Sequence, residues 1–233
     1  IISNRKVAKR FLPAMSRSLS QSGFKVFSHL LSHGDERDKT EKELSKLWSV
    51  MARIPLDRSS TVLALGGGVV GDISAFASST YMRGLALIQV PTTLLAQVDS
   101  AIGGKTAIDL PSAKNMVGTF YQPRMVICDV ETLKGFSVKE FQNSFAEVVK
   151  YGIIRDSALF QLLEKKADRF FSSLEKGRLG PPEFAFLETI VWRSALVKAK
   201  VVEQDEREIK GLRMILNYGH TFGHALEGAS RFK

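Results

Sequence analysis

The chain has 233 residues, of which 44% are hydrophobic and 24% are charged, which is ordinary for one large folded domain or two small ones. It contains no apolar run of about eighteen residues, so we expect no membrane-spanning segment. The single cysteine, Cys128, excludes an internal disulfide framework and a metal site built from several cysteines.

The formal net charge of +9 is compatible with three kinds of partner: nucleic acid, an anionic membrane or a small anionic substrate. The lysines and arginines are scattered without a basic block and do not alternate with aromatic residues, so we expect no nucleic-acid or membrane partner. No targeting peptide is evident, which predicts a cytoplasmic protein. Because the chain begins at Ile1 and not at a methionine, a plastid location after removal of a leader stays open.

In the first half of the chain, predicted strands alternate with predicted helices. Helical periodicity is present over residues 5–21, with Pro13 as an expected break, and over 39–53 and 70–80. Short apolar runs predict strands over residues 24–30, 61–65, 85–90 and 125–129.

The second half carries only helical patterns, over residues 138–151, 157–172, 183–204 and 214–228. Alternation followed by helices alone predicts two domains of different class. We expect an α/β nucleotide-binding domain with a parallel sheet at residues 1–136, and an all-α domain at residues 137–233.

A glycine turn follows the buried strand predicted at 61–65. Gly66, Gly67 and Gly68 lack side chains, so backbone N–H groups at the next helix N-terminus can approach a diphosphate. Asp72, near that helix start, can accept hydrogen bonds from hydroxyl groups. The alternative is a tight turn that needs positive φ and binds nothing.

A polar segment, residues 91–109, follows the strand predicted at 85–90. Thr92 and Thr93 offer hydroxyl donors, and a glycine pair before Lys105 allows that lysine to point into a cleft. Lys105 and Asn115 are ten residues apart and can converge on one phosphate. The alternative is an ordinary surface loop with a solvated lysine.

His220 and His224 are spaced i and i+4, so they share one face of a helix that we expect to open near Asn217. The pair can supply one or two zinc ligands, or one ligand and one acid–base group. Glu147 is the best candidate for a further ligand, because an unpaired carboxylate in an apolar helix is costly, and Lys150 shares its face. The alternative is a helix-capping histidine with a packed one behind it.

Taken together, these segments resemble the 3-dehydroquinate synthase family, sugar-phosphate cyclases of the shikimate pathway. The resemblance runs from about Ile2 to Glu227. It rests on the order and spacing of seven motifs, namely GGGVVGD (66–72), YMRG (81–84), PTTLLAQVDSAIGGKTAID (91–109), KN (114–115), AEVVKYG (146–152), KAKVVEQDERE (198–208) and LRMILNYGHTFGHALE (212–227).

The resemblance implies a carbon–oxygen lyase that converts 3-deoxy-D-arabino-heptulosonate 7-phosphate to 3-dehydroquinate and phosphate. NAD⁺ transiently oxidises a ring hydroxyl, phosphate is eliminated, the hydride returns, and the opened ring closes by an intramolecular aldol step. Zn²⁺, or Co²⁺ in some preparations, polarises the reacting oxygens.

The resemblance also assigns roles to residues of this chain. The metal ligands are Glu147 and His220. The residues that contact the substrate are Lys105, Asn115, Asn217 and His224 near the phosphate and the reacting hydroxyls, Lys150 near the ring hydroxyls, and Lys198 with Arg213 at the carboxylate. Arg83 resembles an arginine donated to the neighbouring subunit, which implies a homodimer. The residues implied for NAD are Gly67, Gly68, Asp72, Thr92, Thr93, Asp99 and Lys114, with Glu36, Lys39 and Asn4 at the ribose.

Departures from the family keep two alternatives open. The third zinc ligand of the family is a histidine that would follow Lys233, the first strand is cut short, and the segment 205–213 is one residue longer than usual. A non-catalytic NAD-binding fragment is therefore one alternative. The other is a related sugar-phosphate cyclase such as an inosose synthase, although its substrate has no carboxylate for Lys198 and Arg213.

Overall fold

The computed structural model describes residues 1–229, without the side chains at positions 224, 225 and 227–229. Its contacts divide the chain into two units, Ile1–Leu133 and Lys134–Lys233. None of the helices in the described part has both the length and the apolar character needed to cross a membrane.

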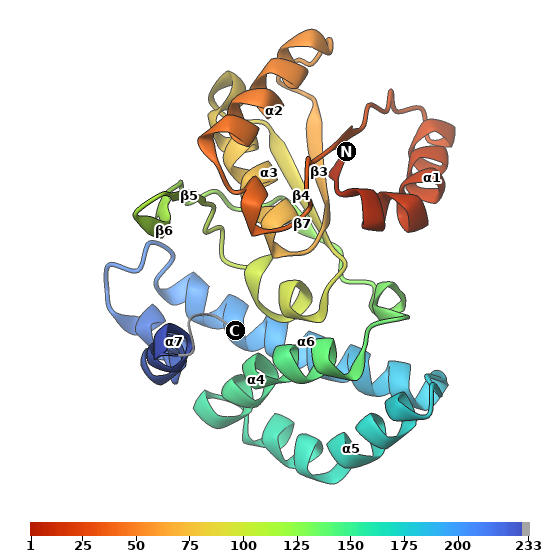
Figure 1. The fold of residues 1–233 in the computed structure, drawn as a ribbon, viewed down its shortest axis with the longest axis vertical. Helices are drawn as coiled ribbons and strands as arrows, with labels where there is room; N and C mark the ends of the chain where they lie inside the picture. Colours follow the sequence, from red (N-terminus) through yellow and green to blue (C-terminus); the bar gives the residue numbers. More distant parts are fainter. Residues whose placement is uncertain (230–233) are drawn as a thin grey trace. The chain divides into compact units, whose positions relative to one another are not determined.

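The first unit is built on five strands, β1 (Ile2–Ser3), β2 (His29–Leu30), β3 (Thr61–Gly66), β4 (Ala86–Pro91) and β7 (Met125–Val126). They form one sheet in the order β2-β1-β3-β4-β7, with every neighbouring pair parallel (Figure 1). The register places Ile2 beside Ala64 and Thr61 beside Ala86.

Three helices accompany this sheet, α1 (Arg5–Gln21), α2 (Glu41–Arg53) and α3 (Gly68–Thr80). Asn4 caps α1 and Thr40 caps α2, each through a side-chain oxygen that accepts a backbone N–H three residues on. α1 and α3 lie on opposite sides of the sheet (Figure 1). The core between α2, α3 and the sheet contains fully buried Leu44, Ile73 and Leu87.

The strand order creates a switch point at the centre of the sheet. The chain leaves β1 toward β2 on one side, and then returns through α2 to β3 on the other side. In open parallel sheets, ligands bind at the carboxyl ends of the strands where the connections diverge in this way. Asn4, Gly67 and Thr92 follow the carboxyl ends of β1, β3 and β4 respectively.

Short elements connect the strands and helices of the first unit. They comprise 3-10 turns at Glu36–Asp38, Tyr81–Arg83 and Val130–Leu133, a π-helical turn at Ala96–Ser100, and an antiparallel hairpin of β5 (Ile108–Leu110) and β6 (Ala113–Val117). The sequence analysis did not foresee the hairpin, because its strands are short and its residues are largely polar or exposed.

The second unit is helical, with α4 (Val138–Ile154), α5 (Ser157–Glu175), α6 (Pro181–Gln204), a 3-10 turn (Leu212–Asn217) and α7 (His220–Ala229). Ser137 and Glu140 form a capping box at the start of α4. Aromatic rings fill the space between α4, α5 and α6: Phe141 and Phe170 meet edge to face at 5.3 Å, and Phe145 and Phe170 stack at 5.7 Å.

Four local predictions were wrong in extent. Only His29–Leu30 of the strand predicted at 24–30 is paired, because its neighbour β1 has two residues. The strand predicted at 125–129 is likewise limited to Met125–Val126. Pro13 does not break α1; it lies on the exposed face, where water can satisfy the carbonyl that lacks a donor. The helix predicted at 214–228 is interrupted by Gly219, whose φ is +81°.

Candidate functional site

The glycine turn after β3 needs glycines for space and not for their backbone angles. None of Gly66, Gly67 and Gly68 has positive φ, and Gly67 is extended at φ −78°. A Cβ on Gly67 would lie 3.0 Å from Cγ2 of Thr93, and one on Gly68 would lie 3.0 Å from the Ser100 hydroxyl. The glycines therefore let the segment after β4 close against the turn.

The start of α3 presents backbone donors at this turn. Gly67 is the N-cap and supplies no side-chain hydrogen bond, so the first N–H groups of α3 have no partner within the helix. Two nearby hydroxyls, of Thr92 and Ser100, are buried and have no hydrogen-bond partner among the described residues. Backbone donors, the helix dipole and these hydroxyls fit a phosphate-bearing ligand.

A cluster of polar side chains around Lys39, the Lys39 cluster, lies near the same turn. Lys39 is 3% exposed, and its Nζ donates to Oδ2 of Asp72 at 2.9 Å and to Oδ1 of Asn115. Glu36 Oε1 lies 3.6 Å from the same ammonium. Burial acts to lower the pKa of Lys39, but the charge and hydrogen bond of Asp72, with help from Glu36 and Asp109, outweigh it and raise the pKa. Lys39 is therefore a fixed positive charge that orients two carboxylates and an amide.

The segment after β4 holds the other predicted nucleotide residues. Thr92 is buried, and its N–H donates to the Gly66 carbonyl at 2.9 Å. Thr93 accepts the Ala96 N–H and begins the turn that leads into the π-helical residues Ala96–Ser100, among them Asp99. π-helical turns often mark functional sites. Ser100, which the sequence analysis missed, had no signal in the chain apart from its position beside Asp99.

The second unit brings Glu147 and His220 together. His220 Nε2 lies 3.3 Å from Glu147 Oε1, and the other oxygen of Glu147 forms an ion pair with the Lys150 ammonium. Lys150 is buried and also donates to the Leu216 carbonyl at 2.8 Å. Lys150 thus ties α4 to the 3-10 turn before α7, which is how His220 comes to face a residue of α4.

Carboxylate and imidazole groups are suitable zinc ligands, so Glu147 and His220 fit part of a metal site. Among the side chains that the structure describes, however, no cluster of three or more His, Cys, Asp or Glu residues is present. His224 lies in α7, but its side chain is outside the described residues. The described side chains therefore offer two ligands in contact with each other, and a complete set needs another donor.

Lys198 and Arg213 are both buried, with Lys198 on α6 and Arg213 in a turn that contacts α6. The Arg213 guanidinium donates to the Glu206 carbonyl at 2.7 Å. The longer segment 205–213 folds around Asp205, whose Oδ1 accepts the N–H groups of Ile209 and Lys210. These hydrogen bonds lower the pKa of Asp205 despite its burial.

The remaining predicted residues are more dispersed. Lys105 is exposed and forms a β-bridge with Phe120, while the amide of Asn115 contacts Lys39. Lys114 is exposed on β6, and Asn217 is exposed before α7. Arg83 is exposed in a turn where both it and Met82 have positive φ, at +66° and +50°.

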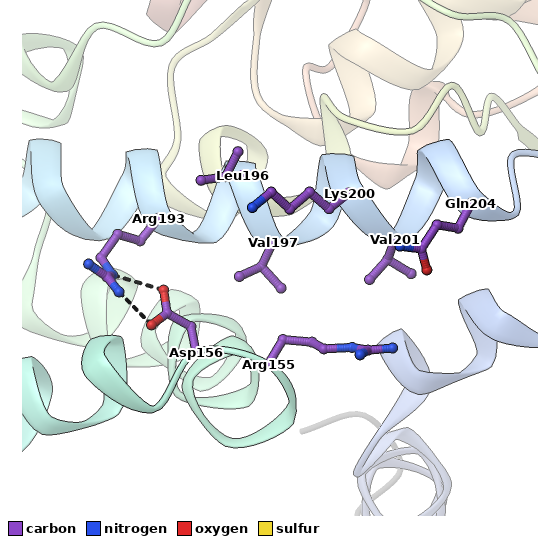
Figure 2. Close-up of a pocket in the computed structure, with 8 residues that line it drawn as sticks. All are labelled: Arg155, Asp156, Arg193, Leu196, Val197, Lys200, Val201 and Gln204. Atoms are coloured by element: carbon purple, nitrogen blue, oxygen red, sulfur yellow. Dashed lines mark hydrogen bonds and ion pairs between the residues drawn. The ribbon is translucent and has the colours of Figure 1, made fainter.

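A cavity of about 340 Å³ opens along α6 in the second unit (Figure 2). Val197 and Val201 point into it, and Arg155 extends along its other side (Figure 2). At one end, Arg193 donates two hydrogen bonds to Asp156, at 2.8 and 2.6 Å. None of the residues predicted for the site lines this cavity.

Comparison with known proteins matches most of the chain to one family. Residues 29–143 match the family model described as 3-dehydroquinate synthase N-terminal, and residues 144–233 match the one described as 3-dehydroquinate synthase C-terminal. A curated 3-dehydroquinate synthase of Pelobacter propionicus is 48% identical over 227 residues, which are 97% of this chain and 60% of that protein. The chain thus spans about 60% of the length of the curated relatives it matches.

Solved structures share the fold. A 2-epi-5-epi-valiolone synthase from Streptomyces hygroscopicus, with NAD⁺ and Zn²⁺ bound, matches 98% of this chain and 61% of its own chain, with a TM-score of 0.85 at 24% identity. A 2-deoxy-scyllo-inosose synthase complexed with carbaglucose-6-phosphate, NAD⁺ and Co²⁺ matches 98% of this chain and 60% of its own, with a TM-score of 0.80 at 30% identity. The expected architecture, a parallel α/β unit followed by a helical unit, is confirmed.

Proposed function

Because this chain belongs to the 3-dehydroquinate synthase family, we propose that it carries the NAD-binding part and the first half of the catalytic part of such an enzyme. The reaction is the conversion of 3-deoxy-D-arabino-heptulosonate 7-phosphate to 3-dehydroquinate and phosphate. This makes the enzyme a phosphate-eliminating lyase of aromatic amino acid biosynthesis. The protein acts in the cytoplasm, or in a plastid if a leader is removed.

The observation that carries this proposal is the glycine turn at the switch point of the sheet, with the Lys39 cluster beside it. The N–H groups in the first turn of α3 suit the diphosphate, and the buried hydroxyl of Thr92 needs a polar partner. Asp72 and Glu36, both held by Lys39, suit the hydroxyls of a ribose. NAD⁺, when bound, supplies a hydride acceptor that later returns the hydride to the substrate.

Glu147 and His220 would hold the metal ion. Their contact at 3.3 Å supports this assignment, since one carboxylate and one imidazole already face each other. The ion, when bound, polarises the reacting oxygens of the substrate. Lys150 forms an ion pair with Glu147 and donates a hydrogen bond to the turn before His220, so it holds these two ligands together.

The substrate carboxylate is assigned to Lys198 and Arg213. Both cations are buried in elements that contact each other, and a guanidinium suits a planar carboxylate. This argues against the related inosose synthases, whose substrate has no carboxylate. Lys105, Asn115, Asn217 and His224 are assigned to the phosphate and the reacting hydroxyls.

Arg83 is assigned to the phosphate site of a second copy in a homodimer. Its exposed position in a turn with two left-handed residues supports this assignment, because such backbone strain is typical of functional positions.

A non-catalytic NAD-binding fragment is the second candidate function. It is favoured by the absence of a third metal-ligating side chain beside Glu147 and His220 in the described part of the chain. Such a fragment would bind NAD⁺ through the first unit and turn nothing over.

Calorimetry on this chain and a phosphate-release assay on the full-length parent enzyme separate the candidates. Binding of NAD⁺ and Zn²⁺ with phosphate release from the heptulosonate phosphate is the expected result for the synthase. Turnover of glucose 6-phosphate alone would favour an inosose synthase. Binding of NAD⁺ without turnover of either substrate would favour the non-catalytic fragment, and failure to bind NAD⁺ would overturn both proposals.

A further inference from the structure

The β5–β6 hairpin is irregular at the point where it meets the Lys39 cluster. Ile108 pairs with Val117 and Leu110 pairs with Ala113, so that Asp109 alone faces residues 114–116. Asn115, in the middle of that stretch, has φ +57°. Asparagine tolerates this left-handed conformation better than most residues, but the conformation still needs support from its surroundings.

Asp109 provides two connections at this point. Its Oδ1 accepts the backbone N–H of Asn115 at 2.7 Å, and its own N–H donates to the Lys39 carbonyl at 2.7 Å. Asn115 in turn accepts a hydrogen bond from Lys39 Nζ through its side chain. Asp109 therefore links the backbones of two residues whose side chains touch but which lie 76 positions apart in the chain.

We propose that Asp109 is a positioning residue, which holds Asn115 in its left-handed conformation against Lys39 and thereby sets the affinity for NAD⁺. Asp109 lies in the segment 91–109, but it is not among the residues to which the family resemblance assigns a role. Without its acceptor, the Asn115 N–H loses its partner, and the backbone at Asn115 relaxes away from the left-handed region. The Asn115 amide then leaves Lys39, which no longer orients Asp72 in the same way. The effect on NAD⁺ rests on the proposed function, whereas the effect on Asn115 does not.

Two variants separate geometry from charge. Asp109→Asn keeps an oxygen acceptor and removes the charge, while Asp109→Ala removes both. Asp57→Ala is the matched control, because Asp57 also accepts a backbone N–H, from Ser59 at 2.8 Å, in the loop before β3. If Asp109→Ala does not fold, Asp109→Glu replaces it, since this variant keeps the charge but moves the acceptor by one methylene.

Two measurements are made on each variant: hydrogen exchange of the Asn115 amide by NMR, and NAD⁺ affinity by calorimetry. Asp109→Ala, or Asp109→Glu in its place, should speed exchange at Asn115 and weaken NAD⁺ binding by about tenfold. Asp109→Asn should change either quantity by no more than about twofold, and Asp57→Ala should change neither.

Unchanged exchange at Asn115 in Asp109→Ala would overturn the positioning role, whatever the result with NAD⁺. Equal loss of affinity in Asp109→Asn and Asp109→Ala would also overturn it, because charge alone would then be responsible. If the unmodified chain binds no NAD⁺, the proposed function and the predicted effect on affinity both fail. In that case, faster exchange at Asn115 supports only the local contact between Asp109 and Asn115.

Discussion

The two units build their candidate sites in different ways. In the first unit, the donors at the glycine turn come largely from backbone groups and hydroxyls in short segments that follow two neighbouring strands. In the second unit, Glu147 and His220 are 73 positions apart and meet where Lys150 ties α4 to the turn before α7. The first site depends on sheet topology, whereas the second depends on side chains that converge and needs a further donor.

The largest expected effect tests the dependence of the first site on backbone access. Gly67→Val places a branched side chain against Thr93, where even a Cβ would lie 3.0 Å from Cγ2, and blocks the N–H groups of α3. We expect NAD⁺ affinity to fall by about a thousandfold or more, about 4 kcal/mol, in calorimetry.

Gly23→Ala is the control for the glycine turn. Gly23 has φ +87° with open space around it, so the substitution should cost about 1 kcal/mol of stability and leave NAD⁺ affinity unchanged. Wild-type affinity in Gly67→Val would mean that the nucleotide does not approach this turn.

The second prediction concerns the buried charge of the first unit. Lys39→Met leaves Asp72 and Asn115 without their ammonium partner, so we expect a loss of about 2–3 kcal/mol in urea unfolding, less than for a fully buried pair because Asp72 is partly exposed. Since the folded pKa of Lys39 is raised, its contribution is complete below the ordinary lysine value of 10.5 and disappears as the pH rises through the higher folded value.

The difference in unfolding free energy between wild type and Lys39→Met should therefore shrink only in strongly alkaline solution. Unfolding titrations at several pH values above and below 10.5 measure this difference. A difference that vanishes near neutral pH would show that Lys39 is not charged in the folded state.

These effects also indicate how far sequence reasoning can reach. The turn at Gly67 and the strands around it were predicted, because glycines and apolar runs act locally and the parallel order follows from alternation with helices. The alternative weighed for that turn required positive φ, which none of its three glycines has, and only the fold shows that Thr93 and Ser100 pack against it.

The Lys39–Asn115 contact and the positioning of His220 by Lys150 could not be predicted from spacing. Both contacts join residues far apart in the chain, and nothing local indicates which partner a buried ammonium will have. The resemblance to a family named these residues, but it described their contacts with ligands and not with one another. Asp109 was missed for the same reason, because its contacts arise from the irregular pairing of the β5–β6 hairpin.

The third prediction tests the scaffold of the second unit. Asp156 caps α5 through Leu159 and accepts two hydrogen bonds from Arg193, which lower the pKa of its carboxyl group. Asp156→Ala removes the cap and the ion pair, and should cost about 1.5–2 kcal/mol in urea unfolding, discounted for partial exposure.

Asp156→Asn keeps the cap and should lose about half as much. Because the folded pKa is lowered, the contribution of the charge is present above the ordinary value of 3.8 and disappears as the pH falls through the folded value. An equal loss in both variants would place the whole effect in the ion pair and none in the cap.

The smallest expected effect addresses the convergent pair in the second unit directly. With Glu147 and His220 as the only facing ligands in the described residues, Zn²⁺ should bind weakly to this chain, and Glu147→Gln should weaken it further by about tenfold, about 1.4 kcal/mol. Glu164→Gln, at an exposed glutamate of α5, is the matched control and should have no effect in the same calorimetric titration. Tight zinc binding that survives Glu147→Gln would mean that the metal uses other donors. The second site would then be formed by those donors, and its comparison with the backbone site of the first unit would have to be made with them.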